Sequence, residues 1–403
     1  MQKHGNTTRG KSTTLHQICN LIPPHLVAKL AREHGSVKDA RSYSHWSHIV
    51  TLIYAQVSHC TSLNDVCDGL QLHTGPLSAI RGAVAPFKNT LSHANKERPA
   101  ALAEALFWSM LTHLQTQAPR FGGGPFKGRL KNLRRNIHLI DSTTIELIAQ
   151  CMPWAKHRRR KAAAKAHVRL DLASYLPGFV LIDSAREHDN KRARELCAGL
   201  NSGEIVVADR GYVDQEHFRE LHERGVIWVT RWKENLVGDL IERRPVPAGG
   251  KILEDAVVAL TNGQAARRIT ALVEVDGQER EMIFLTNQME WSASTIVALY
   301  QSRWSIETFF KELKQNFQVA DFLGNSANAV RWQVWMALLV QLLMRYLSWL
   351  SQWPHSFSRI CTLIRGVIWD RFILDELLKA YGTAKGRFKF ICEPQQAYFA
   401  IFR

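Results

Sequence analysis

The strongest constraint on the fold is an alternation of short strand patterns with helical patterns between residues 136 and 231. Apolar, β-branched runs bounded by turn residues predict strands at 136–143, 167–173, 178–185, 204–209 and 226–231. Helical patterns occupy 189–200 and 214–224. Because strands that alternate with helices form a sheet with helices packed over it, we expect an α/β fold in this part of the chain.

The sequence on either side of this alternation has a different character. Apolar residues at spacings of three and four predict helices before residue 118, for example at 46–57 and 100–114, and Ser62 is placed as a helix N-cap. A Gly- and Pro-rich segment at 118–129 predicts a linker. Between 232 and 287 helical signals are absent and an Asp276-Gly277 turn predicts a β-hairpin. The chain after 292 is predicted to be largely helical up to Gly382.

The charge balance predicts an anionic partner. The chain of 403 residues has 52 Lys and Arg against 36 Asp and Glu, a formal charge of +16. Residues 1–136 alone contain 17 basic and 6 acidic side chains. Clustered cations gain affinity for phosphates by releasing condensed counterions, so nucleic acid is the expected partner.

Several other features limit the class of protein. The N-terminus has no apolar region behind its charges, which predicts a cytoplasmic protein without a secretory signal. The seven cysteines are dispersed and form no CxxC pair, so we expect buried thiols rather than disulfides or a zinc site. The apolar stretch 334–350 contains Gln341 and Arg345, and is short for a membrane span of about 20 residues. A buried core helix is the expected structure there.

Two carboxylates stand where predicted strands meet turns. Asp141 ends IHLID and Asp209 ends IVVAD. Open α/β sheets bind ligands at the carboxyl ends of their strands, and two neighbouring carboxylates repel unless a cation lies between them. The alternatives are that Asp141 caps a turn with Ser142 and Thr143, and that Asp209 pairs with Arg210. For either aspartate alone, both interpretations stay open.

A helix predicted over 292–317, capped by Ser292 or Ser294, carries a charged stripe. At about 100° per residue, Tyr300, Arg303, Glu307 and Lys314 share a face, and Lys311 lies close to it. Spacing alone favours a solvated face of paired charges. Together with Asp141 and Asp209, however, Glu307 completes a set of hard oxygen ligands suited to Mg²⁺ or Mn²⁺. Two such ions about 3.5 to 4 Å apart can catalyse a phosphodiester displacement.

The motifs that contain these residues resemble those of a known family. In chain order they are DSTTI (141–145), ADRGY (208–212) and YQSRWSIETFFKELK (300–314), the last with a Tyr-Arg-Glu-Lys signature. This series is similar to the DDE transposases of bacterial insertion sequences, and within them to the IS-four family. The resemblance covers about 130–350, and the segment 41–70 is similar to the helical domain that precedes the core in one branch of the family.

The resemblance implies a fold and a division of the chain. It implies a ribonuclease H-like α/β catalytic core with a mostly β insertion, preceded by a helical N-terminal domain and followed by a helical C-terminal region. The predicted segments are a helical DNA-binding domain (1–118), a linker (119–135), the first part of the core (136–231), the β-rich insertion (232–290), the core helices with the signature (291–350), and a helical region with an irregular tail (351–403).

The resemblance also implies roles for individual residues. Asp141, Asp209 and Glu307 correspond to the catalytic metal ligands, which hold two Mg²⁺ or Mn²⁺ ions. Tyr300, Arg303 and Lys314 correspond to contacts with DNA at the transposon end. Trp304 could pack in the core or stack on a base, and packing is favoured. In relatives that form hairpins an aromatic residue of the β insertion stacks on a flipped base, and Trp232 and Trp291 are both candidates.

Further DNA contacts are predicted from charge. The run KHRRRKAAAK (156–165) has six cations and no acid, and is either a solvated hairpin loop or a contact with the DNA backbone. On a nucleic-acid enzyme the second interpretation is favoured. The predicted contacts from this run and from the motifs are Arg158, Arg159, Arg160, Arg210 and Lys311.

The function expected from these observations is DNA transposition. The enzyme would bind the terminal inverted repeats of its element, cleave at the ends, and join the 3′-hydroxyl to double-stranded target DNA. The alternatives are a ribonuclease H-fold nuclease without strand transfer and a domesticated DNA-binding regulator. We expect a homodimer on DNA, because two transposon ends are held together. We also expect the protein to associate with the bacterial nucleoid and not with a membrane.

Overall fold

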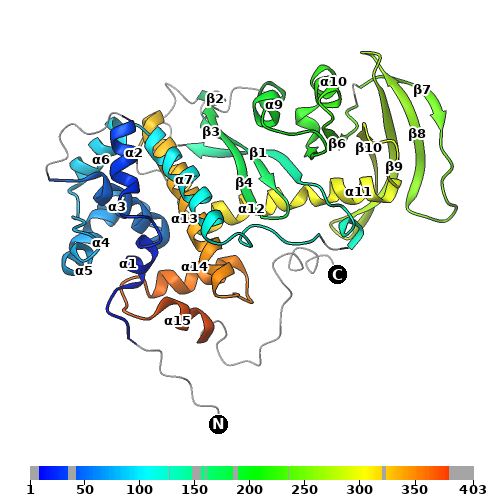
Figure 1. Ribbon diagram of the computed structural model, residues 1–403. Helices are drawn as coiled ribbons and strands as arrows, with labels where there is room; N and C mark the ends of the chain where they lie inside the picture. The colour runs from blue at the N-terminus through cyan, green and yellow to red at the C-terminus, as the bar shows by residue number, and fades with distance from the viewer. Residues whose placement is uncertain are drawn as a thin grey trace, which may run out of the picture. The chain divides into compact units, whose positions relative to one another are not determined.

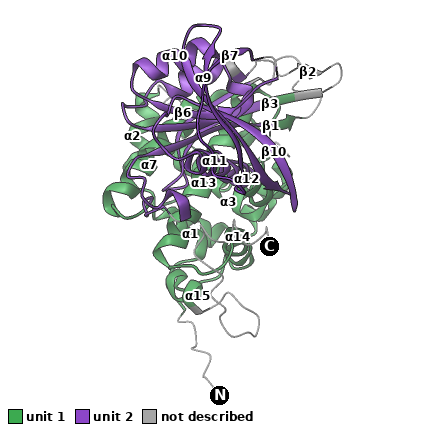
Figure 2. Cartoon of the chain, turned by 90° about the vertical axis from the view of Figure 1, so that its right-hand side faces the viewer, with its two compact units in different colours: residues 1–121, 145–163, 311–399 green, residues 122–144, 164–310, 400–403 purple. Residues whose placement is uncertain are grey.

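The computed structural model describes residues 9–34, 42–126, 128–147, 156–158, 161–184, 189–234, 236–319 and 324–380. Within these ranges the side chains of 156–158, 161, 162, 184, 190 and 380 are not described. The chain divides into two compact units, one made of 1–121, 145–163 and 311–399 and the other of 122–144, 164–310 and 400–403 (Figure 2). Each unit is discontinuous in sequence, whereas the six predicted segments are continuous. That segment division stays a prediction.

The first unit is mostly helical. Its helices before residue 121 are α1 (Thr14–Cys19), α2 (Leu26–Glu33), α3 (His45–Ser58), α4 (Leu63–Gln71), α5 (Thr74–Ser78), α6 (Lys88–Glu97) and α7 (Ala101–Gln117). Those near the C-terminus are α13 (Ala327–Leu350), α14 (Phe357–Gly366) and α15 (Leu374–Ala380). The predicted helices at 46–57 and 100–114 correspond to α3 and α7. The predicted N-cap is confirmed, because Ser62 accepts the Asp65 N–H at 3.1 Å and Asp65 accepts the Ser62 N–H at 2.9 Å.

Helix α13 forms the centre of this unit. It packs against α3, α6, α7 and α14, and even Gln341 in its middle is buried. Arg345 forms an ion pair with Glu312. The prediction of a buried core helix at 334–350 is therefore confirmed. Across the described ranges, no helix combines the length and apolar character needed to cross a bilayer.

The second unit is built on a mixed sheet. Its strands are β1 (Ile137–Leu147), β3 (Lys161–Asp171), β4 (Leu176–Ser184), β5 (Ile205–Ala208), β6 (Ile227–Arg231), β7 (Gly238–Arg243), β8 (Ile252–Leu260), β9 (Ala265–Val275) and β10 (Gln278–Thr286). The order is β2-β3-β1-β5-β6-β10-β9-β8-β7, with β4 also paired to β3 and with β2 being Lys156–Arg158. β1 pairs with β5 and β5 with β6 in parallel. The pairs β6–β10, β10–β9, β9–β8 and β8–β7 are antiparallel.

Helices cover both faces of the parallel strands. α9 (Asp189–Cys197) and α10 (Gln215–Glu223) lie on one face, and α11 (Ala293–Ser302) lies on the other (Figure 1). On the first face Ile140, Val206 and Trp228 from the three parallel strands join Leu196 and Phe218 from the helices in one buried core. The predicted α/β architecture is confirmed. Short elements complete the unit: η1 (Gly128–Leu130) and η3 (Arg210–Tyr212).

The β insertion extends the same sheet. The predicted hairpin is confirmed, since Asp276 and Gly277 both have positive φ, 53° and 74°, between β9 and β10. Positive φ at both central residues is the requirement of a type I′ turn, which Asp-Gly satisfies at low cost. β10 then pairs with β6, so the insertion is joined edge to edge with the parallel strands.

A buried ion pair within the insertion gives a testable stability effect. Arg267 on β9 donates to Asp255 on β8 at 2.8 and 2.6 Å, and both side chains are almost fully buried. Asp255→Ala leaves a buried guanidinium without its counterion, so we expect a loss of about 3–5 kcal/mol in urea denaturation. Glu254→Ala is the control, because its pair with Arg268 is partly exposed and should contribute about 1 kcal/mol or less. Equal effects of the two variants would contradict the prediction.

The described cysteines agree with the expectation of buried thiols. Cys19, Cys60, Cys67, Cys197 and Cys361 are free and buried. Cys151 and Cys392 lie outside the described residues.

Candidate active site

The register of the parallel strands brings two aspartates to one edge of the sheet. β1 and β5 pair in parallel, and the last pair of the ladder is Ile140 with Ala208. Asp141 and Asp209 are the next residues on the two strands. Because each follows a residue of the core on the α9 and α10 face, the alternation of a strand turns its side chain toward the opposite face. The two predicted carboxylates are therefore neighbours.

Local backbone contacts orient the two carboxylates. Asp141 lies inside β1, which continues to Leu147, so the expectation that the strand ends at this residue is wrong. Its Oδ1 accepts the Ser142 N–H at 2.8 Å. Asp209 caps η3 and its Oδ2 accepts the Gly211 N–H at 3.3 Å. The alternative pairing of Asp209 with Arg210 is not adopted: the described ion-pair partner of Asp209 is Arg303.

The predicted helix over 292–317 is two helices. α11 begins after the N-cap Ser292, as expected, and ends at Ser302, and α12 (Trp304–Asn316) begins after Arg303. The Arg303 N–H bonds to the Tyr300 C=O and the Ile306 N–H to the Arg303 C=O, both at 3.0 Å. These i to i+3 bonds tighten the backbone by comparison with an α-helix. The prediction of a single helix was wrong because an even 100° step cannot anticipate such a turn.

Arg303, at this break, contacts all three predicted carboxylates. Its Nη1 lies 2.9 Å from Asp141 Oδ2, its Nη2 lies 2.7 Å from Glu307 Oε1, and its Nε lies 3.9 Å from Asp209 Oδ1. The guanidinium is 9% exposed, while the carboxylates range from 17% for Asp141 to 52% for Glu307. Three acids, one within β1, one directly after β5 and one on α12, thus share a single buried cation.

The electrostatics of the cluster follow from burial and mutual proximity. Burial raises the pKa of Asp141 to about 6, and the charges of Asp209 and Glu307 add to this effect, whereas Arg303 opposes it. For Arg303, burial alone lowers the pKa, but Tyr300 and the three carboxylates more than compensate and hold the pKa above its usual range. The guanidinium is therefore charged, and the cluster favours positive charge at its centre.

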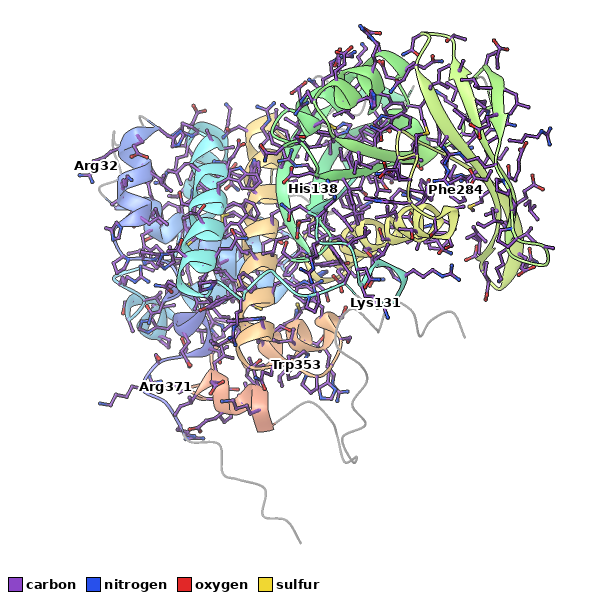
Figure 3. The ribbon with its side chains drawn as sticks, turned by 45° about the vertical axis from the view of Figure 1, so that its right-hand side comes forward. Arg32, Lys131, His138, Phe284, Trp353 and Arg371 are labelled. Carbon is purple, nitrogen blue, oxygen red and sulfur yellow. The ribbon has the colours of Figure 1, made fainter. Side chains whose placement is uncertain are left out.

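Tyr300 belongs to the same cluster. Its side chain is buried, its hydroxyl donates to Asp209 Oδ1 at 3.4 Å, and its ring packs 5.2 Å from that of Phe284 on β10, which is labelled in Figure 3. Burial raises the pKa of Tyr300 to about 12, so the phenol remains a donor. In this arrangement the hydroxyl faces a carboxylate.

The other predicted DNA contacts are placed as follows. Lys311 and Lys314 are exposed on α12, and Arg210 is exposed at the start of η3. Arg158 lies in β2, but its side chain is not described, and Arg159 and Arg160 lie outside the described residues. The basic run is not entirely a loop, because β2 and the start of β3 lie within it. Trp304 is half-buried, and the buried face of α12 consists of Ile306, Phe309, Phe310 and Leu313.

Two charged residues near this edge, Arg231 and Asp189, were missed from the sequence, and a third, Lys165, was considered only as a member of the basic run. Arg231 ends β6, the third parallel strand, and its charge lowers the pKa of Tyr300 in opposition to burial. Its position after an apolar strand, like that of Asp141 and Asp209, was a signal that could have revealed it. Lys165 and Asp189 form an ion pair at 2.5 Å and carry no such signal, because they come together only through the packing of α9 on β3.

The structure separates the two tryptophan candidates for base stacking. Trp291 lines an open hollow of about 650 Å³ together with Arg134, Arg135, Asn136 and Glu204. Asn136 and Glu204 precede β1 and β5, so this hollow is at the opposite edge of the sheet from the carboxylates. Trp232 follows β6, at the carboxyl edge, with the Arg268 guanidinium 5.7 Å from its ring. Of the two candidates, Trp232 is therefore the one at the same edge of the sheet as the carboxylates.

The oxygen atoms of the three carboxylates are of the chemical type that a hard divalent cation prefers. Asp141, Asp209 and Glu307 offer only carboxylate oxygens, which Mg²⁺ and Mn²⁺ prefer. Within the described ranges, no three or more His, Cys, Asp or Glu side chains are gathered closely enough to hold an ion as they stand. The guanidinium of Arg303 supplies the positive charge among the three acids in this arrangement.

Comparisons with known proteins place this geometry in context. The profile of a family described as "Transposase DDE domain" matches residues 133–343, and a domain of unknown function (DUF4372) matches 10–80. A protein named "Putative transposase y4zB", of Sinorhizobium fredii (strain NBRC 101917 / NGR234), is 29% identical over 327 residues, which are 79% of this chain and 87% of that protein.

Two further similarities were found, one to a curated protein and one to a solved structure. The "Probable transposase for insertion sequence element IS5377" of Geobacillus stearothermophilus is 26% identical over 265 residues, covering 64% of this chain and 67% of that protein. Among solved structures, a piggyBac transposase synaptic complex with hairpin DNA matches with a TM-score of 0.44 at 9% identity, covering 90% of this chain and 82% of that one.

Proposed function

The chain belongs to the DDE transposase family, and from this premise we propose that it binds the terminal inverted repeats of its insertion sequence, cleaves at the element ends and joins the freed 3′-hydroxyl to target DNA. The family match makes it a DDE transposase by enzyme class and gives its core the ribonuclease H-like fold. The observation that carries the proposal is the convergence of Asp141, Asp209 and Glu307 on one buried cation.

Divalent metal ions are the general cofactors of this family. We assign Asp141, Asp209 and Glu307 as their ligands, with two Mg²⁺ or Mn²⁺ ions per site. The support is the chemistry of the donors and the burial of Asp141, which raises the pKa of this carboxyl even though Arg303 lies beside it. When bound, such ions activate the attacking water or hydroxyl and stabilise the leaving oxygen of the phosphodiester.

The neighbouring side chains would position the DNA. Arg303 offers a planar fork of donors, which suits phosphate oxygens once divalent cations neutralise the carboxylates. Exposed Lys311, Lys314 and Arg210 would neutralise backbone phosphates. The Tyr300 hydroxyl contacts Asp209, and we propose that Tyr300 acts through this hydrogen bond. That role differs from the direct DNA contact that the family resemblance implies.

The decisive experiment is incubation of the purified protein with DNA carrying its own element ends, a target duplex and Mg²⁺. We expect products in which the 3′-end of the element is joined to target DNA, and no products when EDTA replaces Mg²⁺. Cleavage without joining would support the nuclease alternative, and binding without cleavage would support the regulator. Either result would contradict the proposal.

Paired cutting implies that two ends are held together. We therefore include in the proposal a homodimer on DNA and an association with the bacterial nucleoid. Light scattering of the complex with end DNA should give a mass of at least two chains. A mass of one chain per paired set of ends would reject this part of the proposal.

A further inference from the structure

A second polar cluster lies behind the carboxylates, on the α9 side of the sheet. Its centre is Asp189, the first residue of α9. The Oδ1 atom of Asp189 lies 2.5 Å from Lys165 Nζ and accepts a hydrogen bond from the Ser142 hydroxyl at 3.1 Å. The side chains of Lys165 and Asp189 are only 18% and 23% exposed. Lys165 is therefore held by Asp189, and we set it apart from the cations of the basic run that are predicted to contact DNA.

A buried aromatic pair continues this cluster. His167 Nδ1 lies 3.0 Å from the hydroxyl of Tyr212, and 3.7 Å from Asp189 Oδ1. Burial lowers the pKa of His167 to about 4, so the ring is neutral and accepts from the phenol. Burial, followed by the charge of Asp189, raises the pKa of Tyr212, whereas the hydrogen bond between Tyr212 and Ser142 lowers it. The net shift is upward, so the phenol stays protonated. Ser142 and Tyr212 are thus held by hydrogen bonds to Asp189 and to His167, respectively.

This network touches the residues that orient both catalytic aspartates. Ser142, held by Asp189 through its hydroxyl, donates its N–H to Asp141 Oδ1 at 2.8 Å. Gly211 donates its N–H to Asp209 Oδ2, and a Cβ placed on Gly211 would lie 3.2 Å from Asp189 Oδ2. Asp189 therefore lies against the donor to each aspartate, one on β1 and one after β5.

We propose that Asp189 is a positioning residue that holds the carboxylates of Asp141 and Asp209 in the orientation needed to bind divalent cations. This inference rests on the proposed function. Asp189 acts through Ser142 and Gly211, and the ammonium of Lys165 fixes its carboxylate between them. A carboxylate at a helix N-terminus is in itself ordinary. The specific feature is that this one supports the backbone donors of two metal-binding residues, the task of an outer ligand shell.

The test is Mn²⁺ binding by the full-length protein, read from the EPR signal of free Mn²⁺. Outer-shell substitutions typically weaken metal affinity by about 10- to 100-fold, and we expect this loss for Asp189→Ala. Asp189→Asn keeps an acceptor for Ser142 but loses the pairing with Lys165, so its loss should be smaller. The Mg²⁺ concentration for half-maximal joining should rise in the same order, with affinity for end DNA unchanged.

The matched control is Asp214→Ala. Asp214 begins α10 on the same face of the sheet and accepts the His217 N–H at 3.0 Å, but its described hydrogen bonds and ion pairs involve only α9 and α10. Its removal should lower stability as loss of a helix cap does, by about 1 kcal/mol, with wild-type Mn²⁺ affinity. Wild-type Mn²⁺ affinity in a folded Asp189→Ala protein would overturn the inference.

Two further variants keep the test decisive. If Asp189→Ala does not fold, Ser142→Ala removes only the hydroxyl that joins Asp189 to the Asp141 segment, and we expect its Mn²⁺ affinity to fall several-fold. Unchanged affinity in that variant would overturn the inference. Asp209→Ala separates the assignment of the metal ligands from the role of Asp189. If Asp209→Ala also binds Mn²⁺ like the wild type, the ligand assignment itself is wrong, and the role of Asp189 fails with it.

Discussion

Asp209→Ala is expected to reduce both cleavage and strand joining by at least about a thousandfold, while the affinity for end DNA changes only a few-fold. Stabilisation of transition-state charge by a bound metal ion contributes several kcal/mol, and about 4 kcal/mol corresponds to that factor in rate. Asp209 is a third exposed and lies outside the core clusters, so the protein should remain folded. Gel assays of cleaved and joined products, with Mg²⁺ and then Mn²⁺, measure the effect.

A matched charge control accompanies this variant. Removing any carboxylate makes a basic protein more basic and strengthens DNA binding slightly. Glu216→Ala removes one from the exposed surface of α10, where it pairs with Arg219. We expect wild-type joining from Glu216→Ala and loss from Asp141→Asn, Asp209→Ala and Glu307→Gln alike. Normal joining by any of these three in Mg²⁺ would reject the ligand assignment.

Much of the parallel-strand core could be predicted because its signals are local. IVVAD is an apolar run followed by a carboxylate and a turn, and it corresponds to β5 followed by Asp209. The Asp276-Gly277 turn requires positive φ and was recognisable from two residues. β1 was harder, since its second half beyond Asp141 is polar, and the sequence alone underestimated its length.

The arrangement of the candidate active site depends on packing that no local sequence pattern reveals. The spacing of the helical stripe predicted that Arg303 and Glu307 share one face. It did not predict the turn at Arg303 or the contacts of Arg303 with both aspartates. Asp189 lies 48 residues beyond Asp141 in sequence and reaches Ser142 only because α9 packs on that face of the sheet. Interactions of this kind are set by tertiary contacts between elements, which spacing within one element does not determine.

The second large effect is expected for Arg303→Ala, which removes the cation shared by three acids. Without divalent metal, the unpaired and partly buried carboxylates should lower the free energy of unfolding by about 1–3 kcal/mol. Added Mg²⁺ should then stabilise the variant more than the wild type, because the ion no longer competes with the guanidinium. A tenfold gain in affinity corresponds to about 1.4 kcal/mol. Thermal unfolding over a series of Mg²⁺ concentrations measures both effects.

Joining should nevertheless fall in Arg303→Ala by about 100- to 1000-fold, since a preorganised donor to the reacting phosphates is lost. Arg303→Lys keeps the charge without the planar fork and should be intermediate. Arg345→Ala is the control, because its pair with Glu312 has similarly buried partners, 14% and 13% exposed, in the helical unit. That variant should lose stability that Mg²⁺ does not restore. If Mg²⁺ stabilises Arg303→Ala no more than the wild type, then Arg303 does not compete with metal for the three carboxylates.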